Sequence, residues 1–153
     1  MPAITPSYLY TLFAVIAVSS ILTVSFMNYA NAVRTSLETR KMKNLLDQIA
    51  AKATELLTLT MTTNAKASTF IQAPNAMGEK QYWIRLENDS TRAWLEGGFG
   101  NTPTENTELR AYIPNCALVS GYYISGYGAI CLTCSVDNGA IKIQILSASQ
   151  NGG

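Results

Sequence analysis

The sequence predicts an α+β fold, in which one long N-terminal helix is followed by a small antiparallel β-sandwich or sheet. Residues 8–33 form a run without charge, an apolar helical period continues beyond it, and from residue 64 the apolar residues alternate with a period of two. A chain of 153 residues has room for one modest domain and an appendage. We therefore divide it into an N-terminal helix at 1–63 and a β domain at 64–153.

The first half of the expected helix, residues 8–33, is long enough to cross a membrane, because about 20 apolar residues span the ~30 Å hydrocarbon layer. A cleaved signal peptide would have a basic start and a shorter apolar region of about 7–15 residues. The stretch "MPAITPS" contains no Lys or Arg, and the apolar run is longer. A membrane segment or an assembly helix is therefore favoured over a signal peptide.

Small polar side chains are scattered along this apolar segment. Ser19 and Thr23 lie on one helical face, because they are four residues apart. Small hydroxyl residues let helices approach closely and hydrogen-bond across the contact, whereas a single lipid-facing anchor merely tolerates them. Both alternatives stay open. If the helix polymerises, the residues expected in its contacts are Leu9, Leu12, Phe13, Ile16, Ser19, Ser20, Thr23 and Phe26.

The second half of the expected helix, residues 34–60, is amphipathic. No Gly or Pro interrupts the chain between Ser7 and Leu59, so we expect a single helix of about 50 residues, roughly 75–80 Å long at 1.5 Å per residue. The β-branched stretch "TLTMTTNAK" is predicted to end it, with Asn64 as a cap. The apolar stripe that recurs at spacings of three and four consists of Met42, Leu46, Ile49, Ala53 and Leu56.

The β domain is predicted from short alternating segments separated by turn residues. In "QYWIRLE", for example, Tyr82, Ile84 and Leu86 alternate with Trp83 and Arg85. The "DNG" at 137–139 is a hairpin signal between the last two strands. Six or seven strands are expected, in "TFIQ", "QYWIRLE", "AWLEGGF", "LRAYI", "AICLTCSV" and "AIKIQIL".

Three cysteines, Cys116, Cys131 and Cys134, are best explained by a structural disulfide. A redox CxxC opens a helix in a βαβ context, and structural zinc takes four ligands, whereas this chain has three thiols and no His. On strand alternation Cys134 shares a face with Leu132, so we expect Cys116–Cys134 rather than Cys116–Cys131. Such a bridge implies an oxidising, extracytoplasmic location.

Composition argues against catalysis and against nucleic-acid binding. The chain has no His, which removes the commonest general base and metal ligand. Its net charge of +1 offers no excess of positive charge for phosphate contacts. Glu96, Glu105 and Glu108 are placed in or beside loops without an evident partner. We therefore predict no catalytic residues, no metal site and no cofactor.

Two further motifs concern the surface. Asn88 opens a glycosylation sequon, Asn88-Asp89-Ser90, on a predicted turn, as a secreted domain would allow. The segment 120–130, "SGYYISGYGAI", combines glycines with tyrosines and is either a contact surface or aromatic packing over the sheet. Its tyrosines are Tyr122, Tyr123 and Tyr127.

The order of these features resembles the type IV pilin superfamily, in which an apolar helix continues as an amphipathic helix and precedes a compact β domain. "AITPSYLYTLFAVIAV" at 3–18 is similar to the mature N-terminus of archaeal members, where a small residue, Ile, Ser or Thr and Pro precede an apolar run. The early apolar segment lacks the Glu that bacterial pilins usually carry, so the archaeal branch is the closer resemblance.

The resemblance implies a non-enzymatic subunit of an extracellular filament with a role in adhesion or surface attachment. The subunit would be held in the cytoplasmic membrane and would then polymerise with copies of itself. It also implies a pilus assembly ATPase and a platform protein as partners. The alternative is a single-pass membrane protein whose β domain binds a ligand or partner at the cell surface, and a minor pilin or pseudopilin lies between the two.

The basic residues bear on topology. Arg34, Arg40, Lys41 and Lys43 follow the apolar run, so the positive-inside rule places the β domain in the cytoplasm. The expected disulfide and the sequon favour the opposite side. A basic leader ahead of the printed sequence would reconcile the two, because it would hold the N-terminus inside.

Overall fold

The structure, a computed structural model, describes residues 6–105, 107–114 and 117–150. Helix α1 runs from Pro6 to Thr63 and has 58 residues, which confirms the prediction of one long N-terminal helix. It ends at Asn64, whose φ is +53° and whose N–H donates to the Thr60 carbonyl at 2.8 Å. Asn tolerates this left-handed conformation, so Asn64 caps the helix as predicted.

The chain divides into two units, and the boundary lies within α1, between Leu37 and Glu38. We call the second unit, which begins at Glu38, the compact unit. The amphipathic half of the helix, from Glu38 onward, therefore belongs to the same unit as the strands. Its predicted apolar stripe, from Met42 to Leu56, is buried there. A β-carbon added to Gly97 would lie 3.1 Å from Met42 Sδ, so the helix packs directly against the sheet that contains Gly97.

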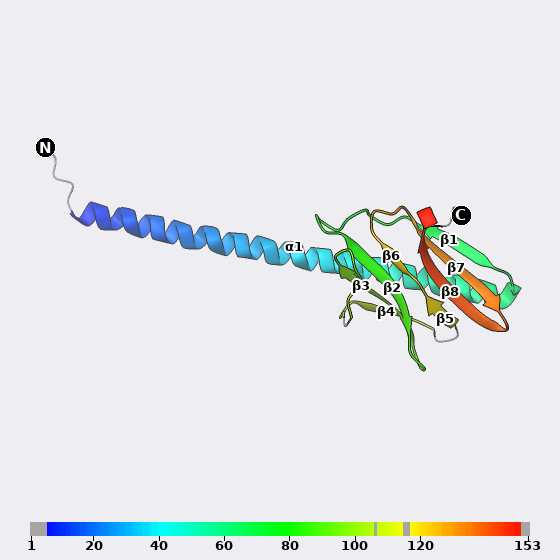
Figure 1. Cartoon of the computed structure of the whole chain (residues 1–153). Coiled ribbons are helices and arrows are strands. Elements are labelled where there is room, and N and C mark those ends of the chain that lie inside the picture. Colours follow the sequence, from blue (N-terminus) through cyan, green and yellow to red (C-terminus); the bar gives the residue numbers. More distant parts are fainter. Residues whose placement is uncertain (1–5, 106, 115–116, 151–153) are drawn as a thin grey trace. The chain divides into compact units, whose positions relative to one another are not determined.

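In the described part of the chain, eight strands follow the helix and form two four-stranded sheets. The strands are labelled in Figure 1. One sheet has the order β1-β7-β8-β5 and the other β4-β3-β2-β6. All pairs are antiparallel except β5–β8, which is parallel, so the α+β class with a mainly antiparallel β part is confirmed. The strands are β1 (Ala67–Ile71), β2 (Tyr82–Asn88), β3 (Ala93–Phe99), β4 (Arg110–Ile113), β5 (Ala117–Ser120), β6 (Tyr122–Ile124), β7 (Ile130–Asp137) and β8 (Ala140–Ser147).

The segment 117–124 contributes an edge strand to each sheet and was not predicted as two strands. Ser120 pairs with Gln144 of β8, and Tyr122 pairs with Arg85 of β2. Gly121 stands between them with φ +102°, and its carbonyl accepts from the Leu86 N–H at 3.0 Å. This single residue therefore connects the two sheets.

One hydrophobic core joins the amphipathic half of α1 with the inner faces of both sheets. Tyr82, Ile84 and Leu86 of β2 lie in it, as the alternation predicted. Trp83 points to the opposite face and is nevertheless fully buried, because its indole ring lies over Gly98 of β3.

Candidate functional site

The apolar half of α1 is the first candidate site. Every residue from Pro6 to Leu37 is exposed in the single chain. Among the residues that the structure describes, α1 is long and apolar enough to cross a membrane. All the residues expected in polymerisation contacts lie on this exposed part of the helix: Leu9, Leu12, Phe13, Ile16, Ser19, Ser20, Thr23 and Phe26.

These residues occupy one side of the helix, because they recur at spacings of three and four. The other sides are apolar as well, with Tyr10, Val18 and Leu22 equally exposed. A helix that is apolar all round is normally buried, either in a large core or in a membrane. The apolar half of α1 is therefore compatible with insertion into a membrane.

Three hydroxyl groups of this segment, those of Thr11, Ser20 and Thr23, are bonded to its own backbone. Thr11 Oγ1 donates to the Ser7 carbonyl at 3.0 Å, Ser20 Oγ to Ile16 at 2.8 Å and Thr23 Oγ1 to Ser19 at 2.8 Å. Each of these three hydroxyl groups therefore donates its hydrogen bond within the helix. None of the three is left as an unpaired donor in apolar surroundings, which would cost free energy. The segment is compatible with lipid and with helix packing alike.

The compact unit begins with a buried acidic residue, Glu38. Its carboxylate Oε2 lies 2.9 Å from the Nζ of Lys80, the last residue of the Met77–Lys80 turn. Gly78 in that turn leaves the room that Glu38 fills, because a β-carbon there would overlap the carboxylate. Glu38 therefore holds this turn against the start of the packed half of α1.

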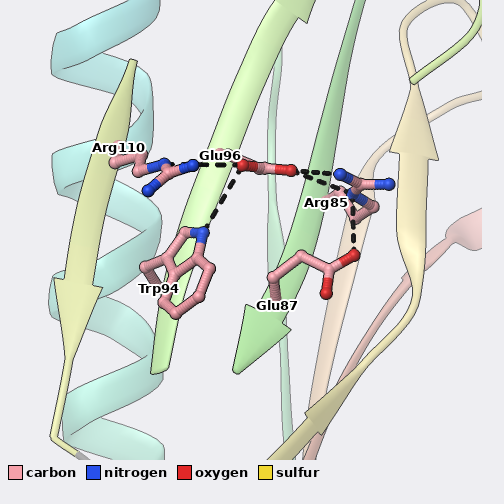
Figure 2. A network of polar contacts seen from close by, with 5 residues as sticks. All are labelled: Arg85, Glu87, Trp94, Glu96 and Arg110. Carbon is pink, nitrogen blue, oxygen red and sulfur yellow. Dashed lines mark hydrogen bonds and ion pairs between the residues drawn. The ribbon is translucent and has the colours of Figure 1, made fainter. Parts of the chain in front are cut away.

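The second candidate site is a charged cluster on β2, β3 and β4, the Glu96 cluster, formed by Arg85, Glu87, Trp94, Glu96 and Arg110. Figure 2 shows the Glu96 carboxylate between the guanidinium groups of Arg85 and Arg110. The prediction that Glu96 lies in or beside a loop without a partner is wrong. Glu96 is in the middle of β3 and is almost fully buried, because the pairing of β3 with β2 and β4 places an arginine on each side of it.

The Glu96 carboxylate has partners at both oxygens. Arg85 donates to Oε1 through Nε at 3.1 Å and also through its terminal nitrogen. Trp94 Nε1 donates to Oε2 at 3.4 Å, and Arg110 Nε lies 3.6 Å from the same oxygen. The Arg110 guanidinium also stacks over the Trp94 ring at 5.2 Å from its centroid.

The two carboxylates beside Arg85 both favour its charged form. The hydrogen bond to Glu96 raises the pKa of Arg85, and Glu87, whose Oε1 is 2.9 Å from Arg85 Nε, raises it further. Arg85 therefore stays charged at any physiological pH. With an arginine beside each oxygen, Glu96 acts as an ion-pair lock between the three strands β2, β3 and β4. Within the described residues, no group of three or more His, Cys, Asp or Glu side chains could hold a metal ion.

The cysteines of β7 are both buried. Cys134 lies in the core with Leu132, and Cys131 points to the opposite face, with its Sγ 3.8 Å from Thr133 Oγ1. Cys131 and Cys134 are not bonded to each other. Cys116 lies outside the described residues, so the Cys116–Cys134 bridge stays a prediction.

The two surface motifs, the sequon at Asn88 and the tyrosine segment 120–130, differ in how much of each is exposed. Asn88 is exposed at the end of β2. In the tyrosine segment Tyr123 packs in the core and donates to the Gly128 carbonyl at 2.8 Å, whereas Tyr122 and Tyr127 are exposed. The sequence left both readings of this segment open, and the structure divides its tyrosines between them.

Within the described residues, the two candidate sites are therefore the exposed apolar half of α1 and the Glu96 cluster, whose charged groups pair with one another. The helix offers a large surface to a partner, whereas the lock stabilises the unit that contains it. No family model, curated protein or solved structure matches this chain.

Proposed function

We propose that this chain is the structural subunit of an extracellular filament and that it polymerises through the apolar half of α1. The observation that carries this is that residues 6–37 are exposed on every side of the helix, including large side chains such as Phe13, Ile16 and Phe26. In water, exposed apolar surface costs about 25 cal/mol per Å². Copies of the same helix packed together would remove that surface from water.

A lipid bilayer would remove it equally well, so the membrane is the expected location before assembly. Transfer from lipid into a filament gains little from the hydrophobic effect, because lipid already solvates the apolar surface. Close packing between helices would hold the filament, and an energy source would be needed to extract the subunit. The resemblance to archaeal type IV pilins implies such machinery, namely an assembly ATPase and a platform protein. It also favours a role in adhesion.

The compact unit fits the outside of such a filament. Its core and its Glu96 lock belong to one unit, which contains the amphipathic half of α1. Its stability is therefore built from its own contacts, and a change in the apolar half should leave it folded.

Substitution of Ile16 tests the proposal. Ile16→Asp places a charge in the apolar segment, whereas Ile16→Leu keeps its character and serves as the matched control. We expect filaments in sheared cell-surface material from the Leu variant and none from the Asp variant. Tryptophan fluorescence of the full chain in detergent should be unchanged in both, because Trp83 and Trp94 both lie in the compact unit.

Intact filaments from the Ile16→Asp variant would contradict polymerisation through this helix. The alternative, a single-pass surface protein, is equally compatible with the three hydroxyl groups that bond within the helix. It predicts detergent-soluble monomers and no filaments from the unmodified chain. Electron microscopy of the sheared material distinguishes the two.

A further inference from the structure

A hollow of about 520 Å³ lies in the compact unit where the β2–β3 turn and the β7–β8 turn approach the end of α1. The sequon residues Asn88, Asp89 and Ser90 form its polar side. Its apolar side includes Met61 and Leu118, whose side chains are 58% and 56% exposed. The hollow therefore combines a modification motif with apolar surface that the single chain leaves uncovered.

The β2–β3 turn presents the sequon in a fixed conformation. Asp89 Oδ1 accepts from the backbone N–H groups of Thr91 at 2.7 Å and Arg92 at 2.6 Å. The Asp89 N–H in turn donates to the Arg92 carbonyl at 2.8 Å. These bonds hold the turn closed, and Asn88 and Ser90 on either side of Asp89 are exposed.

We propose that Asn88 carries an N-linked glycan whose first sugars lie in this hollow against Met61 and Leu118. The donor would be an oligosaccharide linked to a polyprenyl phosphate or pyrophosphate. Asn88 Nδ2 forms a bond to the anomeric carbon of the first sugar while the bond from that carbon to the phosphate oxygen breaks. The lipid phosphate leaves with the bonding electrons, and Nδ2 loses one proton to solvent.

The dimensions and chemistry of the hollow suit this occupant. Its volume falls within the range of about 300–1,000 Å³ that is typical of small-molecule sites. A pyranose ring has an apolar face of C–H groups and a polar rim, which match Met61 and Leu118 on one side and Asp89 and Ser90 on the other. Covering the two apolar side chains would remove surface from water at about 25 cal/mol per Å².

The inference requires only that the compact unit is exported from the cytoplasm. It does not depend on polymerisation of α1, so the two proposals fail separately. Filaments of unmodified chain would overturn the glycan alone, and modified monomers would overturn the filament alone.

The first measurement is the intact mass of the full chain recovered from its native cells, followed by glycopeptide mapping. We expect a sugar mass on the peptide that contains Asn88, its loss in Ser90→Ala and its retention in Ser90→Thr, because Thr preserves the sequon. Asn101→Gln, which removes an exposed Asn outside any sequon, should keep the modification. An unmodified Asn88 in the wild-type chain would overturn the proposal.

The second measurement tests where the sugars lie. Hydrogen peroxide oxidises exposed Met side chains, so Met61 should react several-fold faster in the Ser90→Ala chain than in the glycosylated chain. Buried Met42 and Met77 serve as internal references for the integrity of the fold. Enzymatic removal of the glycan from the folded wild-type chain should give the same increase. Equal oxidation of Met61 with and without the glycan would overturn its placement in the hollow.

Discussion

The indole ring of Trp83 lies so close to Gly98 that a β-carbon at residue 98 would come within 2.7 Å of Cζ2 of the ring. The two residues are direct partners across β2 and β3. Trp83 points away from the helix-facing core and is still fully buried. The absence of a side chain at Gly98 is what allows the ring to lie flat on the outer face of the sheet.

Gly98→Ala should therefore destabilise the compact unit by about 1–3 kcal/mol, the usual cost of overpacking. The ring cannot move away freely, because it is fully buried. Denaturant unfolding of the full chain, followed by circular dichroism, measures the change. In a Trp83→Leu background the same Ala substitution should cost much less, and an unchanged cost in that background would contradict the contact.

Glu96→Gln should cost about 1–3 kcal/mol, because Glu96 is buried and the change leaves Arg85 and Arg110 without the carboxylate that they share. Glu55→Gln is the matched control, since Glu55 pairs with Lys52 at the surface. Its effect should stay within about 0.5 kcal/mol, as for other exposed pairs. Equal effects of the two substitutions in denaturant unfolding would show that Glu96 is not a lock.

Gly121→Ala should be much more damaging than Gly126→Ala. Both glycines have a positive φ, +102° and +93°, so each Ala carries a similar backbone strain of about 1–2 kcal/mol. At Gly121 the new β-carbon would also overlap the Ile145 carbonyl oxygen, whereas nothing lies within 4 Å at Gly126. We expect a further loss of about 1–3 kcal/mol at Gly121 or failure to fold. Similar unfolding free energies for the two variants would contradict the role of Gly121 as the close junction between the sheets.

Stability should fall at high pH because of two buried tyrosines. Burial raises the pKa of Tyr82 above its ordinary 10.0, and burial also raises that of Tyr123. A raised folded-state pKa gives a contribution that is complete below the unfolded pKa near 10 and is lost as the pH rises toward the folded value. The unfolding free energy should therefore be insensitive to these groups below pH ~9 and decline above pH ~10.

Tyr82→Phe should reduce that decline by up to about 1.4 kcal/mol per pH unit, the contribution of one proton. Denaturant titrations at a series of alkaline pH values measure the slope. Tyr127→Phe, which changes an exposed ring, is the control and should keep the wild-type slope. Identical slopes for the Tyr82 variant and the wild type would contradict the burial of that hydroxyl group.

Local patterns were sufficient to predict the helix and the clearest strands. The helix follows from an uncharged apolar run that continues as a period of three and four, without Gly or Pro between Ser7 and Leu59, and Asn64 caps it because Asn tolerates a positive φ. The hairpin at 137–139 follows from its turn residues in the same way. In each case the interactions that decide the structure lie within a few residues along the chain.

The strands β5 and β6 could not be found in this way. Each is only three or four residues long, and the Gly121 between them is typical of a loop. Their partners, Gln144 and Arg85, are distant in sequence, and the parallel pairing with β8 leaves no local turn signal. Neither element would be stable without the sheet edge that it joins.

Of the two candidate sites, one could be predicted from the sequence and the other could not. The apolar half of α1 was evident from composition, because a long uncharged run has few possible surroundings. The Glu96 cluster was missed, since a single Glu in "AWLEGGF" has no visible partner until strand register brings arginines from both neighbours beside it. A clue was present in Arg85 and Glu96, which occupy the outward positions of two predicted strands.

The sequence by itself determined the long helix, its apolar and amphipathic halves and the α+β class, because these depend on periodicity and on hydropathy within single segments. Only the tertiary structure decided that Trp83 is buried on the outer face, that Gly121 joins two sheets and that Glu96 is locked between two arginines. Those outcomes depend on register and on close contacts between distant strands, and no local pattern encodes either one.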